Sequence, residues 1–275
     1  MSLILIGGKS SLSKTLKLNL ENKNIKYLES NRCQDAEILI DLNNINTFSN
    51  IPNNLKKAII FAGITSIDIC ENNKTLANKI NYLNTIKLIN KLNDQGTKCL
   101  ILSSSSVFAN KSTSNREYDK KEPDTYYGKL KSKLEDEILN NQLNCIIRLT
   151  KVILPEMQLI KNWIYNLKIN QSITAFSNLY ISPISDFSFN EIIYDWIRIG
   201  FSGIYHLTSD NQISYYDFIF DLSLSLGLDK SLIIPTKCNK NIIFKPIKSY
   251  LDCDLEYSKS KKLSDELKLI RNYFQ

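Results

Sequence analysis

The residues of this chain that could do chemistry together lie in its central stretch. Tyr127 and Lys131 are four residues apart, so they share one face if a helix starts near Asp124. An ammonium near a phenol favours the phenolate and lowers the phenol pKa, which lets the tyrosine exchange a proton near neutral pH. The apolar run from Cys99 to Leu102 ends in the serines 103–106, a pattern typical of a buried strand that opens into a polar site. A serine hydroxyl there could hold a carbonyl oxygen while charge develops on it.

The spacing of this pair is not unusual by itself. A tyrosine followed four residues later by a lysine occurs twice among the 14 tyrosines, and the second case, Tyr257 and Lys261, lies in a polar tail with no serine-ended strand before it. The central pair differs because it is part of a longer motif with fixed spacing, which also contains Glu117, Asp119, Pro123, Gly128 and Glu135.

The central stretch resembles a known family. The motif SSSSVF followed by E.D...P...YG..K...E is similar to the extended short-chain dehydrogenase/reductase superfamily, and most similar to its dTDP-4-dehydrorhamnose reductase branch. Segment 67–71, IDICE, resembles the VD..E segment of that branch and favours it over the sugar-nucleotide epimerases. The resemblance implies an α/β fold, a Rossmann-type doubly wound parallel sheet with a smaller C-terminal substrate-binding lobe. It also implies an NAD(P)H-dependent reductase of a nucleotide-linked 4-keto-6-deoxysugar, in the biosynthesis of cell-surface polysaccharide sugars.

Catalytic roles follow from the same resemblance. Tyr127 would protonate the substrate oxygen, Lys131 would hold the cofactor ribose and lower the tyrosine pKa, and Ser104 would bind the carbonyl. Ser104 is chosen because it lies three residues before Val107, as the family's catalytic Ser or Thr does, with the serines on either side of it as fallbacks.

The N-terminal segment predicts a phosphate-binding turn. The apolar run Leu3 to Ile6 leads into a turn and then a helical pattern up to about Leu20, an arrangement in which backbone N–H groups and a helix N-terminus can hold a pyrophosphate. The resembled family has the spacing G..G..G, and here these positions are Gly7, Ser10 and Ser13. A Cβ at the second position should weaken binding unless the loop shifts, although a serine hydroxyl could donate to a phosphate or simply cap the helix. The expected cofactor contacts in the turn are Gly7, Lys9, Ser10, Ser11 and Leu12.

Two charged residues leave the form of the cofactor, NAD or NADP, open. Glu29 ends the predicted second strand, Ile25 to Leu28, near the place where an acid accepts hydrogen bonds from a ribose diol and selects NAD. Arg32 follows closely and could instead meet the 2′-phosphate of NADP. The resemblance adds further cofactor contacts: Asp41 and Leu42 at the adenine, Ala62 and Gly63 as points of close backbone approach, and Tyr127 and Lys131 themselves.

The alternation of strands and helices up to about residue 150 predicts a parallel sheet with helices on both faces and a ligand crevice at the carboxyl ends of the strands. We expect a dinucleotide-binding domain over residues 1–153 and a mostly substrate-binding lobe over 154–275 that partly returns to the first domain. The other expected elements include strands at Ala36–Leu42 and Ala58–Ala62, a long helix at Lys74–Leu92, a helix opened by Pro155, another at Phe189–Ile199 and a closing segment at 245–249.

The composition, with 43% hydrophobic and 23% charged residues, is that of an ordinary soluble globular protein. No apolar run approaches the about 18 residues that span a bilayer, and the start of the chain is too short for a signal peptide, so we expect a cytoplasmic protein that does not bind membranes. The net charge of +7 comes from scattered lysines, which argues against nucleic-acid binding and suits an anionic cofactor and a nucleotide-sugar substrate. The six cysteines lack metal-ligand spacing and the single histidine, His206, lies in the strand-like segment GIYHL, so no metal site is expected.

Two other functions fit the same residues. A sugar-nucleotide epimerase of the same superfamily uses the same serine, tyrosine and lysine. A non-catalytic NAD(P)-binding subunit, like the regulatory subunit of methionine adenosyltransferase, would explain the loss of two glycines from the phosphate turn. A sugar 4,6-dehydratase is disfavoured, because its Asp-Glu pair after the catalytic hydroxyl is replaced here by Ser105 and Ser106. The sequence leaves the sugar and the oligomeric state open, a homodimer included.

Overall fold

The computed structural model describes residues 2–33, 36–108, 115–238 and 251–275. The chain divides into unit 1, with Met1–Ala109, Lys120–Arg148 and Asn190–Tyr205, and unit 2, with Asn110–Asp119, Leu149–Phe189 and His206–Gln275. The predicted closing segment, 245–249, lies outside the described residues. The predicted boundary at residue 153, between a cofactor-binding domain and a substrate-binding lobe, stays a prediction.

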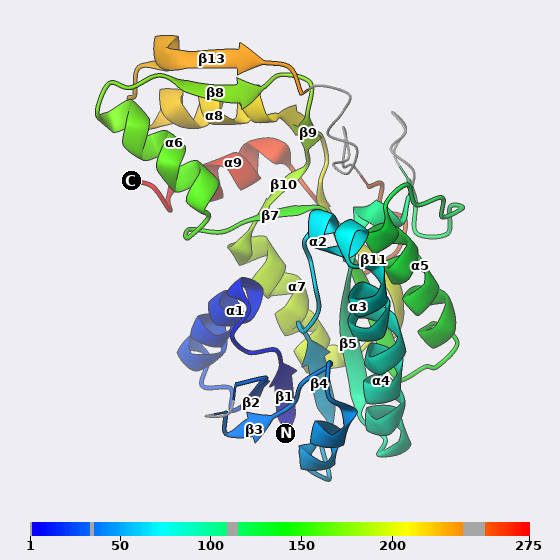
Figure 1. Cartoon of the computed structure of the whole chain (residues 1–275). Coiled ribbons are helices and arrows are strands. Elements are labelled where there is room, and N and C mark those ends of the chain that lie inside the picture. Colours follow the sequence, from blue (N-terminus) through cyan, green and yellow to red (C-terminus); the bar gives the residue numbers. More distant parts are fainter. Residues whose placement is uncertain (1, 34–35, 109–114, 239–250) are drawn as a thin grey trace. The chain divides into compact units, whose positions relative to one another are not determined.

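Unit 1 is built on strands in the order β6-β5-β4-β1-β2-β3 (Figure 1). β1 pairs in parallel with both β2 and β4, β2 pairs in parallel with β3, and β4 with β5. The chain order therefore reverses between β1 and β4, and open α/β sheets bind ligands at such a switch point, at the carboxyl ends of the strands. The predicted α/β fold with a mostly parallel sheet is confirmed. The strands are β1 (Leu3–Ile6), β2 (Leu28–Asn31), β3 (Ile38–Leu39), β4 (Lys57–Ile60), β5 (Lys98–Ser104) and β6 (Asn144–Leu149).

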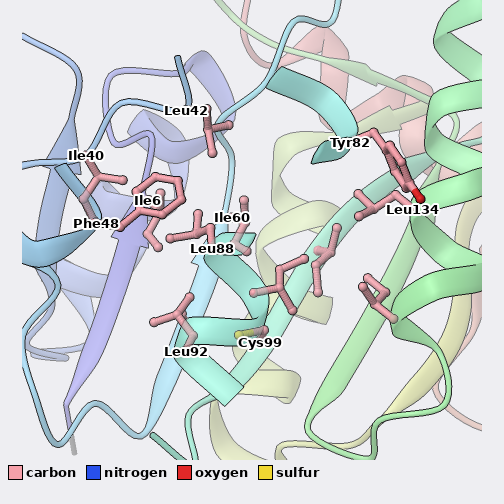
Figure 2. Packing of buried hydrophobic residues seen from close by; sticks show 14 of the residues in the cluster. Ile6, Ile40, Leu42, Phe48, Ile60, Tyr82, Leu88, Leu92, Cys99 and Leu134 are labelled. Carbon is pink, nitrogen blue, oxygen red and sulfur yellow. The ribbon is translucent and has the colours of Figure 1, made fainter. Parts of the chain in front are cut away.

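The sheet of unit 1 is buried on both faces, which explains why β1 and β4 have no alternating pattern and are apolar or buried throughout. One face forms a core with helices α4 and α5, and Figure 2 shows Ile6 and Ile60 from the strands near Leu88 of α4. Leu3 and Leu5 alternate to the other face, on which Figure 1 shows α1. The helices of unit 1 are α1 (Ser11–Asn22), the 3₁₀ turn η1 (Ile45–Asn50), α2 (Ile67–Asn72), α3 (Lys74–Asn78), η2 (Lys79–Asn84), α4 (Thr85–Asp94), the 3₁₀ turn η3 (Ser105–Val107) and α5 (Tyr126–Ile138).

Several predicted elements are corrected by the structure. The strand predicted at Ile25–Leu28 starts only at Leu28, because the Ile25 N–H still bonds to Leu20 O and closes the turn after α1. The third strand is shorter than predicted, since only Ile38 and Leu39 pair with β2. The long helix predicted at 74–92 is present, but its middle, η2, is a π-helix. Pro155 lies in a turn rather than opening a helix, and α6 begins at Gln158.

Unit 2 consists of short strand pairs and helices around a second core that includes Trp163, Phe218 and Ile270. β7 pairs in parallel with β10, β8 with β13, and β11 with β14, whereas β9 and β12 are antiparallel. Two elements, α7 (Asp186–Ile199) and β11 (Gly203–Ser209), begin in one unit and end in the other. The elements of unit 2 are β7 (Lys151–Ile153), α6 (Gln158–Lys168), β8 (Ile173–Phe176), β9 (Tyr180–Ile181), β10 (Pro183–Ser185), β12 (Ile213–Ser214), α8 (Tyr215–Ser225), η4 (Lys230–Leu232), β13 (Ile233–Thr236), β14 (Lys259–Lys261) and α9 (Leu263–Arg271). Within the described ranges, no helix has both the length and the apolar character needed to cross a membrane.

Candidate active site

All of the predicted site residues lie in unit 1, and the turn after β1 is held tightly between two strand ends. The N–H groups of Gly7 and Gly8 donate to Ser30 O of β2, at 3.0 and 2.9 Å. Gly7 has a φ of +88°, and a Cβ on it would lie 2.7 Å from the backbone nitrogen of Ala62, just beyond β4. Only glycine fits this position, because the two strand ends approach each other at the switch point.

The two serines at the missing glycine positions belong to the start of α1, where Ser10 is the N-cap and Ser13 lies in the first turn. Ser10 has φ −68° and ψ 151°, a conformation that any L residue adopts, and its Oγ accepts from the Ser13 N–H at 3.2 Å as the N-cap of α1. Ser13 is completely buried. A hydroxyl that accepts one hydrogen bond still has its own proton to donate, and the first turn of α1 carries no acidic residue. The N-terminus of α1 therefore fits an anionic group such as a pyrophosphate, with Lys9 and Ser11 exposed and Leu12 partly buried beside it.

Glu29, the acid that was expected to contact the cofactor ribose, is paired with a lysine of the same unit. Glu29 lies within β2 rather than after it, its side chain lies against the backbone of Gly8, and its Oε2 is 2.6 Å from Lys17 Nζ. Arg32 follows the end of β2 and is exposed. The Glu29 charge is therefore offset by a lysine, while a guanidinium lies beyond the strand end.

The residues predicted at the adenine form a local turn. Asp41 Oδ1 accepts from the Asn43 N–H at 2.9 Å, and Leu42 is 5% exposed. Asn84, at the end of the π-helix, donates from Nδ2 to Leu42 O at 2.7 Å. The π-helix thus fixes the backbone of this turn, which sequence reasoning did not foresee.

A second asparagine of the π-helix fixes the loop after β4. Asn81 accepts from the Ile64 N–H at 2.7 Å and donates to Ile64 O at 2.8 Å, so its amide holds both backbone groups of Ile64. Ala62 and Gly63 immediately precede Ile64, and Gly63 is exposed. Asn81 is 3% exposed, which gives a structural reason for an asparagine inside a helix.

The serines at the end of β5 face different environments. Ser103 is buried, and its hydroxyl donates to Glu135 Oε1 at 2.5 Å. Ser104 is only partly buried, caps η3 by accepting from the Ser106 N–H at 3.1 Å, and donates to Ser106 Oγ. This geometry favours Ser104 over Ser103 as the hydroxyl that can reach a ligand, and Ser105 stays a fallback.

Helix α5 brings the tyrosine and the lysine to these serines. Thr125 caps the helix by accepting from the Gly128 N–H at 3.0 Å, and a Cβ on Gly128 would lie 2.0 Å from Ser106 O. Glycine at this position therefore lets the first turn of the helix touch the serine-rich strand end. The same turn is held by Glu71 of segment 67–71, whose Oε1 accepts from the Tyr126 N–H at 2.5 Å.

The pKa of Tyr127 shifts in the direction opposite to the one predicted from its spacing to Lys131. Burial, with a smaller contribution from the Cys70 thiolate, raises the pKa of Tyr127, which is 8% exposed. Burial also lowers the pKa of Lys131 to about 8. Lys131 Nζ lies 5.9 Å from the Tyr127 ring centroid and donates to Leu102 O at 2.8 Å. The expectation that the lysine lowers the tyrosine pKa is therefore wrong for this structure, because desolvation outweighs the charge. A Tyr127 phenol that keeps its proton can act as a proton donor.

A buried ion pair lies one helical turn beyond Lys131. Arg148 of β6 donates to both oxygens of Glu135, at 3.0 and 2.7 Å, and their side chains are 1% and 2% exposed. Lys121 Nζ is 3.3 Å from the same carboxylate. With the Ser103 bond, this network fastens α5 to the ends of β5 and β6. Sequence reasoning kept Glu135 in its motif but assigned it no role.

Fold and site together define a class: a Rossmann-type α/β protein with a glycine turn after its first strand, a serine-rich end of β5, and a tyrosine and a lysine at the start of α5. The profile of the RmlD substrate binding domain family matches residues 1–263. The chain belongs to this family, and the resemblance stated from the sequence is confirmed.

Solved structures of similar fold support this assignment. The dTDP-4-dehydrorhamnose reductase of Bacillus anthracis, solved in complex with NADP, has a TM-score of 0.84 and 18% identity over 97% of both chains. The enzyme of the same name from Clostridium acetobutylicum has a TM-score of 0.83 and 22% identity over 99% of this chain and 98% of its own. That from Yersinia enterocolitica has a TM-score of 0.84 and 23% identity over 100% and 99%. A search of curated proteins gives no match.

Proposed function

We propose that the chain is an NAD(P)H-dependent reductase of a nucleotide-linked 4-keto-6-deoxysugar, similar to dTDP-4-dehydrorhamnose reductase. The observation that carries the proposal is the contact between the first turn of α5 and the serine-rich end of β5, which gathers Ser104, Tyr127 and Lys131 at the strand ends. The family membership and the dTDP-4-dehydrorhamnose reductases of similar fold support it. As predicted from the sequence, the proposal includes a cytoplasmic location and a role in making sugars for cell-surface polysaccharides.

The three side chains have distinct roles in this reaction. A bound nicotinamide cofactor would supply the hydride. Ser104 turns the proton that it donates to Ser106 Oγ in the structure toward the keto oxygen, where negative charge develops. Tyr127 transfers its phenol proton to that oxygen, and its raised pKa keeps the proton on the phenol before the reaction. Lys131, which donates to Leu102 O, would also hold the ribose hydroxyls of a bound cofactor.

NADPH is the proposed preferred cofactor. The carboxylate of Glu29, which would repel a 2′-phosphate, is paired with Lys17, and Arg32 offers an exposed guanidinium beyond β2. The structures of similar fold include complexes with NADP and with NAD. The turn itself would hold the pyrophosphate through Gly7, Ser10 and Ser11 at the N-terminus of α1. Because Ser10 adopts ordinary backbone angles and caps α1, the loss of a glycine at this position gives little reason to prefer a non-catalytic subunit.

The test is oxidation of NADPH by the purified protein on addition of a dTDP-linked 4-keto-6-deoxysugar, followed by nicotinamide absorbance and by analysis of the sugar product. Tyr127→Phe should lose about 10²–10⁴-fold in rate, because general acid catalysis is worth about that much. Tyr126→Phe is the matched control, since it removes a neighbouring hydroxyl on the same turn. Full activity in Tyr127→Phe would exclude the proposed mechanism. A product that differs only in stereochemistry, without net NADPH oxidation, would identify the epimerase instead.

A further inference from the structure

Unit 2 brings together three side chains of types that bind transition metals: Glu117, His206 and Cys253. Their potential ligand atoms all lie within 4.8 Å of one another. The side chains of Glu117 and His206 are 0% exposed, and Cys253 is partly buried. The three residues come from distant parts of the chain, so sequence spacing gave no sign of the cluster.

Hydrogen bonds orient the carboxylate and the imidazole toward each other. Glu117 Oε1 is 3.7 Å from His206 Nδ1 and accepts a hydrogen bond from the Ser258 hydroxyl. Glu117 Oε2 accepts from the Asp254 N–H at 3.1 Å, and Ser258 Oγ in turn accepts from the His206 N–H at 2.9 Å. Outer contacts of this kind fix the orientation of ligands in metal sites.

The charges around the cluster favour a cation. Asp252 and Asp254 flank the cysteine, and Arg116 lies 3.5 Å from each of these two carboxylates. Acidic side chains therefore lie on both sides of the cysteine in the chain, and carboxylates favour a nearby cation.

We propose that Glu117 Oε1, His206 Nδ1 and Cys253 Sγ bind one divalent transition-metal ion of the zinc type. A carboxylate, an imidazole and a thiolate form a donor set typical of zinc, whereas calcium and magnesium prefer oxygen ligands. Bonds of about 2.0–2.3 Å around a tetrahedral zinc place its donors about 3.5 Å apart. The separation of 3.7 Å between Oε1 and Nδ1 is close to this, and the partly buried thiol has to approach by about 1.3 Å at most. The proposal is independent of the proposed reductase function.

Binding changes the protonation of two ligands. Nδ1 lies 2.8 Å from Asp252 O, which can only accept, so the neutral ring carries its hydrogen on Nδ1. Binding at Nδ1 breaks its hydrogen bond to Asp252 O, so that carbonyl has to turn away while the Nδ1 hydrogen moves to Nε2. The thiol gives up its proton to solvent as the metal–sulfur bond forms. One proton is released for each ion bound, so the affinity should fall as the pH is lowered.

The experiment is titration of the chelator-treated full chain with Zn²⁺ by calorimetry, and with Co²⁺ by absorption spectroscopy. We expect one ion per chain, a thiolate-to-cobalt charge-transfer band, and release of about one proton, measured in buffers of different ionisation enthalpy. Cys253→Ser should lose the charge-transfer band and bind zinc at least about 100-fold more weakly. Losing only a contact to a ligand costs about 10–100-fold, so loss of the ligand itself should cost more. Ser258→Ala, which removes such a contact, should weaken binding by about 10-fold.

Cys33→Ser is the matched control, because it removes another partly buried thiol, from unit 1. It should keep the affinity and the cobalt band of the original chain. Equal melting temperatures of the chain and of Cys253→Ser in the presence of chelator would show that the substitution leaves the fold intact. Absence of a cobalt–thiolate band, or an unchanged zinc affinity in Cys253→Ser, would overturn the proposal and leave the cluster as a Glu–His pair held by Ser258 and by the backbone of Asp252 and Asp254.

Discussion

Substitution of Glu135 by glutamine removes the charge at the centre of the buried network beside the candidate active site. Arg148, 1% exposed, would keep its charge and lose the Glu135 carboxylate. Removing one partner of a buried ion pair costs about 3–5 kcal/mol, and because glutamine retains a hydrogen-bonding carbonyl we expect about 3 kcal/mol. In urea unfolding this loss should lower the midpoint by about 1–3 M, given slopes of about 1–3 kcal/mol/M.

The same substitution should change the titration of Lys131. Burial lowers the pKa of Lys131 to about 8, while the Glu135 carboxylate raises it. Without the Glu135 charge the pKa of Lys131 falls further below its usual range, so the ammonium is lost at a lower pH. The affinity for NADPH should therefore begin its alkaline decline at a lower pH in Glu135→Gln, as measured by nicotinamide fluorescence across a pH series. Because the unfolded lysine keeps its proton to a higher pH than the folded one, stability should rise as the pH rises above about 8, and earlier in the variant.

A double substitution separates the two effects. Glu135→Leu with Arg148→Met replaces the whole pair by apolar side chains, which should restore most of the stability because no buried charge is left alone. It should not restore the titration of Lys131, since the carboxylate is still missing. The reasoning is refuted if Glu135→Gln unfolds within about 0.5 kcal/mol of the original chain, or if its alkaline decline stays at the original pH.

Three further substitutions test separate parts of the account. Arg32→Ala should weaken NADPH binding by about 10–100-fold and leave NADH binding unchanged, because a charge-assisted hydrogen bond is worth about 1.5–3 kcal/mol; equal losses for both cofactors would argue against a 2′-phosphate contact. Lys57 donates to Trp196 O and Ile197 O at the opposite end of β4 from the candidate site, so Lys57→Met should cost about 2 kcal/mol in urea unfolding without changing NADPH affinity. Gly128→Ala places a Cβ 2.0 Å from Ser106 O and should destabilise the fold by at least about 2 kcal/mol; a thermal midpoint equal to that of the original chain would contradict the close contact.

Much of the fold could be predicted because buried parallel strands leave a clear sequence pattern. Residues 3–6, 57–60 and 99–101 are buried throughout, and small or polar residues follow each run within two positions. The start of β2 was missed because the residues 25–27, although partly apolar, close the turn after α1 through a backbone bond that composition does not reveal.

The chemistry of the site was less predictable than its location. The i, i+4 spacing placed Tyr127 and Lys131 on one face of α5, but the sign of the Tyr127 pKa shift depends on burial, which spacing does not give. Glu29 was found by its position in the chain, whereas its pairing with Lys17 follows from how α1 packs on β2. The tertiary contacts that hold the site, such as the Glu71 cap on α5, join residues far apart in sequence.

The central claim is that the glycine turn and the strand ends of unit 1 bind a reduced nicotinamide dinucleotide, and titration of the purified protein with NADPH and NADH tests it most directly. Nicotinamide fluorescence should show saturable binding well below millimolar concentration, with NADPH the tighter ligand, and Gly7→Ala should weaken both because its Cβ would lie 2.7 Å from Ala62 N. Absence of binding by either dinucleotide at millimolar concentration would contradict the reductase proposal.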